Sequence, residues 1–462
     1  MPSDIKNIFN ELNLFGNLTE KISSLHANKN ELHISPLYGA SKAFLIKELI
    51  IQASELLIFL PDTKTALELS VELGILGLER HIILIDDFKA ESIQGKLTDI
   101  FNRDKPILIS TYDLLNLELP SKAEVDKTTT KIQVGGDIAY DDLIEYLNLL
   151  EYQQDKFVEA PGEFSLRGSI IDFWSYSEHN PVRLEYDGDF LESIRHFDPD
   201  SQRSIEKVNT VTLAGKLIDR YDGGEQKRCT DIFDYLNNPL ILASRYELNN
   251  FNFSSRNIFS LEESGSNEPV DLEEDNFTEP ITKQENELEE KINTYELINR
   301  PARWILEEEI GASDDRIDLG FAEVPTIHSN YEVLFNVLKD YTDNSFDITI
   351  TSENELQTIK LKELLSEFKK ELAELIESGK INIETLAIKE GFLHKEKKLL
   401  ILTDYQIFNK PYRTKSPAKR KYKVSKSRSF ASIKKGDFVV HEDYGIGKYL
   451  VLETIQIGEI KQ

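Results

Sequence analysis

The chain has 462 residues, of which 40% are hydrophobic, and a formal net charge of −28 at pH 7. At roughly 100 to 200 residues per domain, this length accommodates two to four domains with sizeable cores. The sequence has no run of about 18 apolar residues and no basic, apolar leader, so we expect neither a membrane helix nor a secretory signal. We therefore expect a cytoplasmic protein. Cys229 is the only cysteine, which excludes an intramolecular disulfide and a cysteine zinc site.

The charge is distributed unevenly along the chain. Residues 262–290 carry twelve acidic side chains and one lysine, whereas residues 411–435 carry ten basic side chains and no acid. A strongly negative chain repels DNA on average, because nucleic-acid affinity rests on Lys and Arg that neutralise phosphates. Each block is typical of a solvated segment. The basic block is either a linker kept soluble by its charge or a nucleic-acid contact.

Strand-like and helical runs alternate between residues 31 and 118. Four runs have the pattern of buried strands: ELHISPL, LLIFLPD, HIILIDD and PILISTYDLL. Two runs have the pattern of helices: SKAFLIKELIIQAS and TKTALELSVELGIL. Strands that alternate with helices of about 10 to 15 residues predict an α/β domain with a parallel sheet.

The turn after the first of these strands has the layout of a phosphate-binding loop, with Gly39, Ser41 and Lys42 in HISPLYGASKAF. A working loop reads G-x-x-x-x-G-K-[ST], in which the glycines admit the phosphates and the hydroxyl binds magnesium. Here Gly39 is the only glycine and Ala43 follows the lysine. We therefore expect no nucleotide or other cofactor at this loop, and no other pattern nominates a catalytic or metal-binding residue.

Residues 155–212 contain short alternating strands punctuated by Gly and Pro, which predicts a β-rich module. VRLEYDGDFLES has the pattern of a hairpin with Asp187-Gly188 at its tip, and in that register Arg183 faces Glu192. Two interpretations of Arg183 stay open. It forms a cross-strand ion pair worth about 0.2 to 1 kcal/mol, or it projects with Arg167 toward a partner, since arginine is enriched at interface hot spots.

The rest of the chain contains two further patterned regions. Residues 328–409 alternate helices and strands again and predict a second small α/β domain. The last 30 residues read as strands, with Gly445-Ile446-Gly447 at a tight hairpin, and the pattern is still running at Gln462. We therefore expect a final module that is cut, and a chain that is a fragment.

The stretch 157–204 resembles the module that bacterial transcription-repair coupling factors share with the excision-repair protein UvrB. Their pattern, P-G-E-F-x-x-R-G-x-x-[IL]-D, then R-[IL]-[DE]-[FY], G-[DE], E-S-[IL]-R and F-[DE]-x-x-[ST]-Q-R-S, is matched at nearly every element. The resemblance implies that this module binds UvrA through Arg167, Arg183 and Tyr186. The relatives often have a second aromatic directly after the tyrosine, where Asp187 stands here.

This interpretation makes a direct prediction for the two arginines. Arg167→Glu and Arg183→Glu should each abolish UvrA capture without lowering the melting temperature, whereas unfolding of the variants would favour the ion pair.

KKGDFVVHEDYGIGKYLVLETIQIGEIK resembles the start of the RNA polymerase-interacting, CarD-like module of the coupling factors. Ile455 is the candidate apolar contact with RNA polymerase, and its alternative is a core position of a small barrel. The degenerate phosphate loop also fits the coupling factors, and it counts against the alternative of a UvrB-like ATP-dependent DNA-damage-binding protein.

The resemblance further implies a division of labour in a longer protein. This part is an adaptor without its own ATP site. ATP, magnesium and most DNA contacts belong to a translocase half beyond Gln462, and the protein is a monomer. The implied fold is a multidomain α/β chain. A degenerate helicase-like parallel domain carries an inserted β-rich UvrA-binding module, and a second small α/β domain and the start of a small β-barrel follow.

The expected domains follow one another along the chain. They are a UvrB-like α/β domain, first part (1–120), the UvrA-binding module (121–212), the second part of the α/β domain with the acidic segment (213–327), a small α/β middle domain (328–410), a basic linker (411–433) and the truncated polymerase module (434–462).

Overall fold

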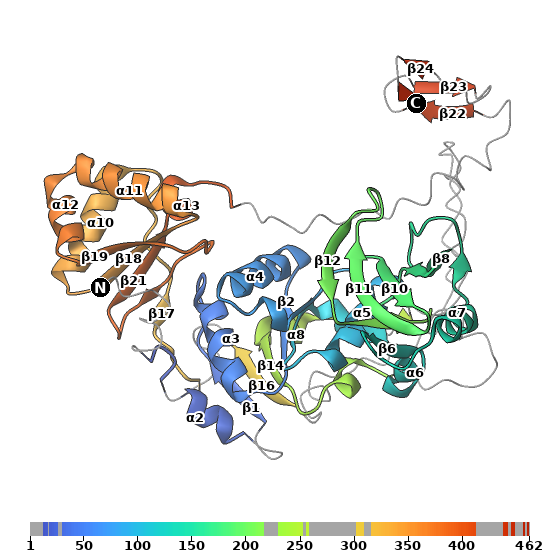
Figure 1. Cartoon of the computed structure of the whole chain (residues 1–462). Coiled ribbons are helices and arrows are strands. Elements are labelled where there is room, and N and C mark those ends of the chain that lie inside the picture. Colours follow the sequence, from blue (N-terminus) through green and yellow to red (C-terminus); the bar gives the residue numbers. More distant parts are fainter. Residues whose placement is uncertain are drawn as a thin grey trace, which may run out of the picture. The chain divides into compact units, whose positions relative to one another are not determined.

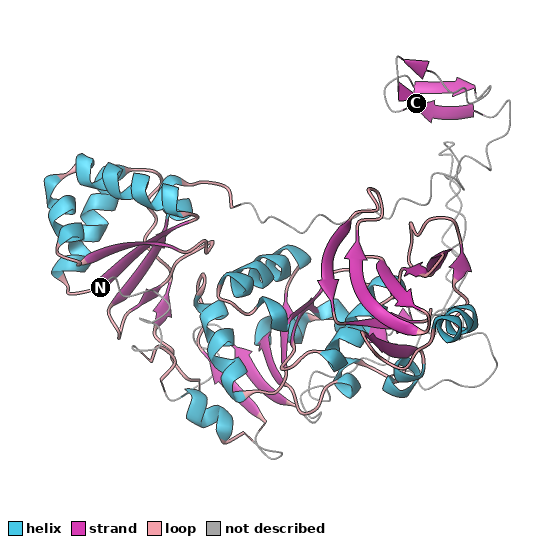
Figure 2. Cartoon of the chain, viewed as in Figure 1, coloured by secondary structure: helices cyan, strands magenta, loops and turns pink. Residues whose placement is uncertain are grey.

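The computed structural model describes most of the chain (Figures 1 and 2). The described residues are 13–16, 18–25, 30–216, 230–252, 256–257, 302–308, 316–412, 438–441, 445–448, 456–457 and 460–461. The acidic segment 262–290, nearly all of the basic linker and Ile455 lie outside them. No helix within the described ranges is long and apolar enough to cross a membrane.

A six-stranded, fully parallel sheet forms the first α/β domain. In sheet order its strands are β1 (Glu31–Ile34), β16 (Arg303–Glu307), β14 (Leu240–Ser244), β2 (Leu56–Leu60), β4 (Ile107–Thr111) and β3 (Ile82–Ile85). The parallel sheet predicted from 31–118 is therefore confirmed. Two strands from after residue 230 lie between β1 and β2, so the first and second parts of this domain share one sheet.

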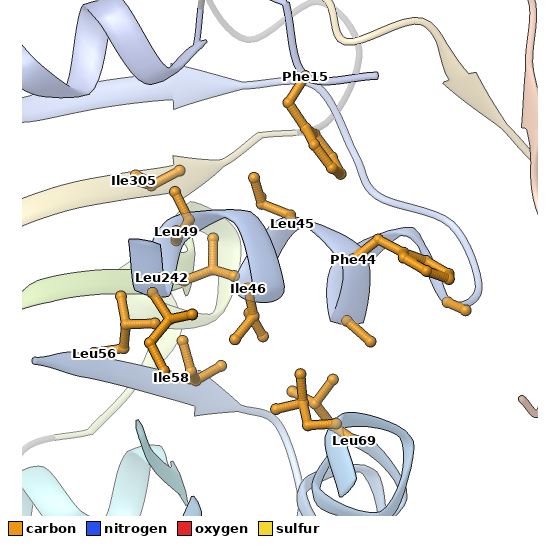
Figure 3. Close-up of a cluster of buried hydrophobic side chains, with 14 of the residues drawn as sticks. Phe15, Phe44, Leu45, Ile46, Leu49, Leu56, Ile58, Leu69, Leu242 and Ile305 are labelled. Atoms are coloured by element: carbon orange, nitrogen blue, oxygen red, sulfur yellow. The ribbon is translucent and has the colours of Figure 1, made fainter. Parts of the chain in front are cut away.

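Helices cover both faces of this sheet, which is why its strands are almost continuously apolar. They are α3 (Ser41–Gln52), α4 (Thr63–Ile75), α5 (Ala90–Asn102) and α8 (Arg245–Asn250). Ile58 of β2 packs into the core under α3, whereas its neighbour Leu57 packs into the core on the opposite face. Figure 3 shows Ile46 and Leu49 of α3 pointing toward the sheet residues of the first core.

The β-rich module forms a second compact unit at Thr128–Lys216, with which the residues from Pro417 onward are grouped. Its six-stranded sheet has the order β12 (Ser204–Val208), β11 (Phe190–Phe197), β10 (Val182–Asp187), β9 (Ile170–Phe173), β8 (Glu163–Arg167) and β7 (Gln153–Gln154). A second pair, β6 (Thr129–Gln133) and β13 (Thr210–Ala214), is antiparallel. Helix α7 (Tyr140–Leu149) shares one core with the inner face of the sheet.

A second, five-stranded sheet follows in the same unit as the parallel sheet, which spans Met1–Lys127 and Leu217–Ser416. Its order is β17 (Phe321–Ala322), β20 (Leu393–His394), β21 (Leu399–Thr403), β18 (Asp347–Ser352) and β19 (Ile381–Thr385). Helices α10 (Tyr331–Asp343), α11 (Glu355–Phe368), α12 (Lys370–Glu377) and α13 (Asp404–Phe408) complete it. The helices and four of the five strands lie within 328–410, whereas β17 precedes this range.

Short elements complete the described chain. They are α2 (Leu18–Ser23), β5 (Leu117–Glu118), α6 (Lys122–Lys127), β15 (Arg256–Asn257), β22 (Phe438–His441), β23 (Gly445–Lys448), β24 (Gln456–Ile457) and β25 (Ile460–Lys461). β22 and β23 form an antiparallel hairpin in which His441 pairs with Gly445. The Gly-Ile-Gly sequence lies inside β23, so its predicted place at the turn of the hairpin is wrong.

Candidate functional site

Asp172 is the buried centre of the outer face of the module's six-stranded sheet, the face turned away from α7. It lies on β9, directly opposite Arg183 on β10, and its side chain is fully buried. Nε and Nη2 of Arg183 donate hydrogen bonds to the two carboxylate oxygens, at 2.7 and 2.8 Å. These bonds raise the pKa of Arg183 above its usual value. The pair is therefore a bidentate, charge-assisted contact that fixes the plane of the guanidinium.

The hairpin of β10 and β11 differs from the predicted one. Asp187 pairs with Phe190, so the tip is Gly188-Asp189, with Gly188 at a φ of +60°. The register shifts between Glu185 and Tyr186 and leaves one residue of β11 unpaired, which is a β-bulge.

The bulge changes the cross-strand neighbours. Arg183 faces Arg195 and not Glu192, so the predicted Arg183–Glu192 pairing is wrong. The two arginines tolerate this position because each has its own carboxylate. Arg183 bonds Asp172, and Nη2 of Arg195 bonds Glu185. An ion pair at Arg183 thus exists, but its partner comes from the preceding strand.

Arg167 is more accessible than Arg183 on this face. It ends β8, and 37% of its side chain is exposed, compared with 16% for Arg183. Its Nη1 lies 3.9 Å from Oδ2 of Asp172, and its Nη2 donates to the carbonyl of Lys156 at 3.3 Å. Because Arg183 already takes both carboxylate oxygens at short range, Arg167 keeps charge to offer to a partner.

Tyr186 lies in the core of the module, with 4% of the residue exposed. Its hydroxyl donates to the carbonyl of Ile138 at 3.3 Å, and its ring packs edge-to-face on Tyr140 at 5.5 Å. Burial raises its pKa to about 12. The proposed direct contact of Tyr186 with a partner does not suit this position. The side chain faces inward because β10 alternates, and it supports the strand that carries Arg183.

Sequence reasoning missed two residues of this face. Asp172, which anchors Arg183, ends the R-G-x-x-[IL]-D stretch, so its signal was present in the motif. Phe157 lies under Arg167, with the guanidinium carbon 5.1 Å from the ring centroid. An isolated aromatic between a lysine and a valine carries no such signal.

At the loop between β1 and α3, which has the layout of a phosphate-binding loop, a carboxylate of the protein bonds to the donors. Nζ of Lys42 lies 2.9 Å from Oε2 of Glu307, and the Leu37 N–H donates to Oε1 at 2.8 Å. The Tyr38 N–H donates to Oγ of Ser41 at 2.9 Å. The groups that would cradle a phosphate are thus bonded to the end of β16 and to the loop itself.

The second α/β domain closes the same loop from the other side. The Ala40 N–H donates to the carbonyl of Glu390 at 2.8 Å. Gly39 has a φ of +51°, and a Cβ there would lie 2.1 Å from the carbonyl oxygen of Gly391. Phe44 and Phe392 pack edge-to-face beside this contact at 6.1 Å. The loop therefore binds a protein backbone, and its glycine is needed for that close approach.

Comparison with known proteins agrees with both motif-based resemblances. Residues 130–216 match the family model of the UvrB interaction domain, and residues 433–462 match the CarD-like/TRCF RID domain. These ranges contain the β-rich module and the C-terminal strands.

Curated relatives extend the similarity over most of the chain. The transcription-repair-coupling factor of Bacillus subtilis is 23% identical over 512 residues, covering 95% of this chain and 43% of the relative. That of Borreliella burgdorferi is 23% identical over 484 residues, covering 92% and 40%. The chain thus spans less than half the length of these relatives. The resemblance to the transcription-repair coupling factors is confirmed, with a UvrB interaction domain and a CarD-like/TRCF RID segment in one chain.

Proposed function

We propose that this chain is the adaptor part of a transcription-repair coupling factor, in which the UvrB interaction domain binds UvrA. This proposal rests on the exposed guanidinium of Arg167, which lies beside the fixed Asp172–Arg183 pair on the outer face. An arginine that is oriented by neighbours and still charged suits a carboxylate of a partner protein.

Capture of UvrA by the immobilised chain tests this function. Arg167→Glu should reduce capture at least tenfold, because it replaces the accessible cation with an anion. Lys370→Glu is a matched charge reversal, since Lys370 is 90% exposed on α12 of the other unit, and it should leave capture unchanged. Wild-type protein that fails to retain UvrA would contradict the proposal.

The CarD-like segment is the proposed contact with RNA polymerase, and Ile455 is the proposed apolar contact within it. Ile455→Asp should weaken capture of RNA polymerase and leave capture of UvrA unchanged, since the two surfaces belong to different modules. Equal loss of both would instead indicate a general folding defect.

The adaptor works without a nucleotide of its own. This part of the proposal rests on Glu307, which holds Lys42 and the Leu37 N–H where a phosphate would bind. Calorimetric titration of the chain with ATP and magnesium should show no saturable binding. A Kd in the micromolar range would favour the UvrB-like ATP-dependent alternative.

A further inference from the structure

We propose that Lys156, Phe157 and Arg167 form a cation–aromatic patch that supplies the apolar half of the UvrA contact. This inference rests on the proposed function. The patch would receive a segment of UvrA in which an apolar side chain adjoins a carboxylate.

Two cations lie close to the ring of Phe157 at the surface. The guanidinium carbon of Arg167 is 5.1 Å from the ring centroid, and Nζ of Lys156 is 5.6 Å from it. The residue is 43% exposed, so part of the ring stays accessible. Cations on the π-system orient the ring and leave its remaining surface for an apolar partner.

These side chains line an open groove of about 650 Å³ at the β7–β8 edge of the sheet. Leu166 adds apolar surface, and Asp155 contributes one acid against the two cations. The Asp155 carboxylate accepts a hydrogen bond from the Lys156 N–H. The balance of charge in the groove favours an acidic ligand.

The loop that carries Phe157 is fixed on the side that leads into β8. The Lys156 carbonyl accepts from Oγ of Ser165 at 3.0 Å and from Arg167. The Glu163 carboxylate accepts from the N–H groups of Glu159 and Ala160, at 2.8 and 3.0 Å.

The residue after Phe157 is anchored as well. Val158 is fully buried against Trp174 and Phe197, and Arg183 lies over the ring of Phe197. The Phe157 side chain is therefore held in position before the partner binds, and binding loses little conformational entropy at this position. The same anchors connect the patch to the Asp172–Arg183 pair, so it is continuous with the proposed UvrA surface.

Single exposed aromatics are common on proteins, so a matched residue is needed. Phe190 provides it, because it is 57% exposed and belongs to the same module. It pairs with Asp187 at the hairpin tip, three strands away from Arg167.

The test measures UvrA affinity of the full chain by biolayer interferometry. Phe157→Ala should weaken binding at least tenfold, Phe157→Tyr should restore it to within threefold of wild type, and Phe190→Ala should stay within twofold. Lys156→Gln should reduce affinity and flatten its dependence on salt. Trp174 fluorescence in a Trp304→Phe background checks that each variant keeps the module folded, since Trp174 packs beside Val158.

The outcomes separate this inference from the function on which it rests. Normal binding by Phe157→Ala, with Arg167→Glu still defective, would overturn the aromatic patch and leave the adaptor function intact. A loss with Phe190→Ala alone would place the apolar contact at the hairpin tip and also overturn it. Absence of UvrA binding by the wild type would contradict both the aromatic patch and the adaptor function.

Discussion

Arg167 and Arg183, both on the module's outer face, differ in how much the fold depends on them. Arg183 is largely buried and bonds both oxygens of Asp172, whose side chain is fully buried. Arg183→Glu would place two carboxylates together and should destabilise the module by about 3 to 5 kcal/mol, as for other broken buried pairs. The expectation that this substitution leaves the melting temperature unchanged is therefore replaced by one of clear destabilisation.

Trp174 fluorescence in a Trp304→Phe background measures this effect, because each unit contains one of the chain's two tryptophans. Arg167→Glu is the control, and its cost should stay below about 1 kcal/mol because its ion pair is long and partly exposed. Equal melting temperatures for the two variants would contradict the distinction.

At this scale the sequence nominated Arg167 and Arg183 but did not predict their contacts. The motif contained Arg167, Arg183 and Asp172, and strand alternation alone would have turned Tyr186 inward. The hydrogen bonds between Asp172 and Arg183 depend on the neighbouring strand β9, and a hairpin pattern read over β10 and β11 contains no information about that strand.

At the scale of elements, Glu72 of α4 lies in the contact with residues 386–392 of the second α/β domain. Its Oε1 accepts from the Lys389 N–H at 3.0 Å, and the residue is only 7% exposed. Burial raises the pKa of this carboxyl from 4.5 to about 7. The fold thus favours the neutral form. The contribution of protonated Glu72 to the free energy of unfolding is fully present below about pH 4.5 and is lost as the pH rises through about 7.

Glu72→Gln should remove this dependence, because the amide oxygen can still accept from Lys389 and cannot ionise. The difference in the free energy of unfolding between pH 5 and pH 8 should be smaller than in the wild type by up to about 3 kcal/mol. Urea unfolding followed by Trp304 in a Trp174→Phe background measures it. Glu79→Gln, an exposed position beyond α4, should change nothing, and an unchanged pH slope in Glu72→Gln would refute the assignment.

Substitution of Gly39 tests the contact between the β1–α3 loop and the second α/β domain. Gly39→Ala adds a Cβ that would clash with the Gly391 carbonyl, so the loop and the second domain must separate. Gly77 has a φ of +87° and open space around its Cβ position, so Gly77→Ala bears only the backbone strain of about 1 to 2 kcal/mol. Unfolding of Gly39→Ala should occur at clearly lower urea than that of Gly77→Ala. Similar midpoints would show that the contact is dispensable.

The elements themselves were largely predictable, whereas their connections were not. Apolar runs such as LLIFL and PILIST identified β2 and β4, because strands covered on both faces are continuously apolar. The β-bulge opposite Tyr186 escaped prediction, since one extra residue leaves the hydrophobic pattern almost unchanged. Glu307, which occupies the phosphate loop, is 265 residues from Lys42, and no local pattern relates the two.

At the scale of the whole molecule, the β-rich module interrupts a domain whose sheet is completed by later strands. The interruption is possible because the module's ends meet. Thr129 pairs with Ala214 across β6 and β13, and the Gly215 N–H donates to the Thr128 carbonyl at 2.9 Å. A module with adjacent ends and its own core can be inserted into another domain with little disturbance of either.

The module should therefore fold when it is expressed alone as residues 128–216. Its Trp174 unfolding midpoint should match that of the second unit in the full chain, and it should bind UvrA with an affinity within about threefold. A shorter fragment, 134–209, lacks β6 and β13 and with them the core residues Ile132, Val211 and Leu213. Removing three buried aliphatic side chains costs more than such a small domain can lose. Hence it should show no cooperative transition, whereas a 128–216 fragment without one would mean that the surrounding domain is needed to hold the module's ends together.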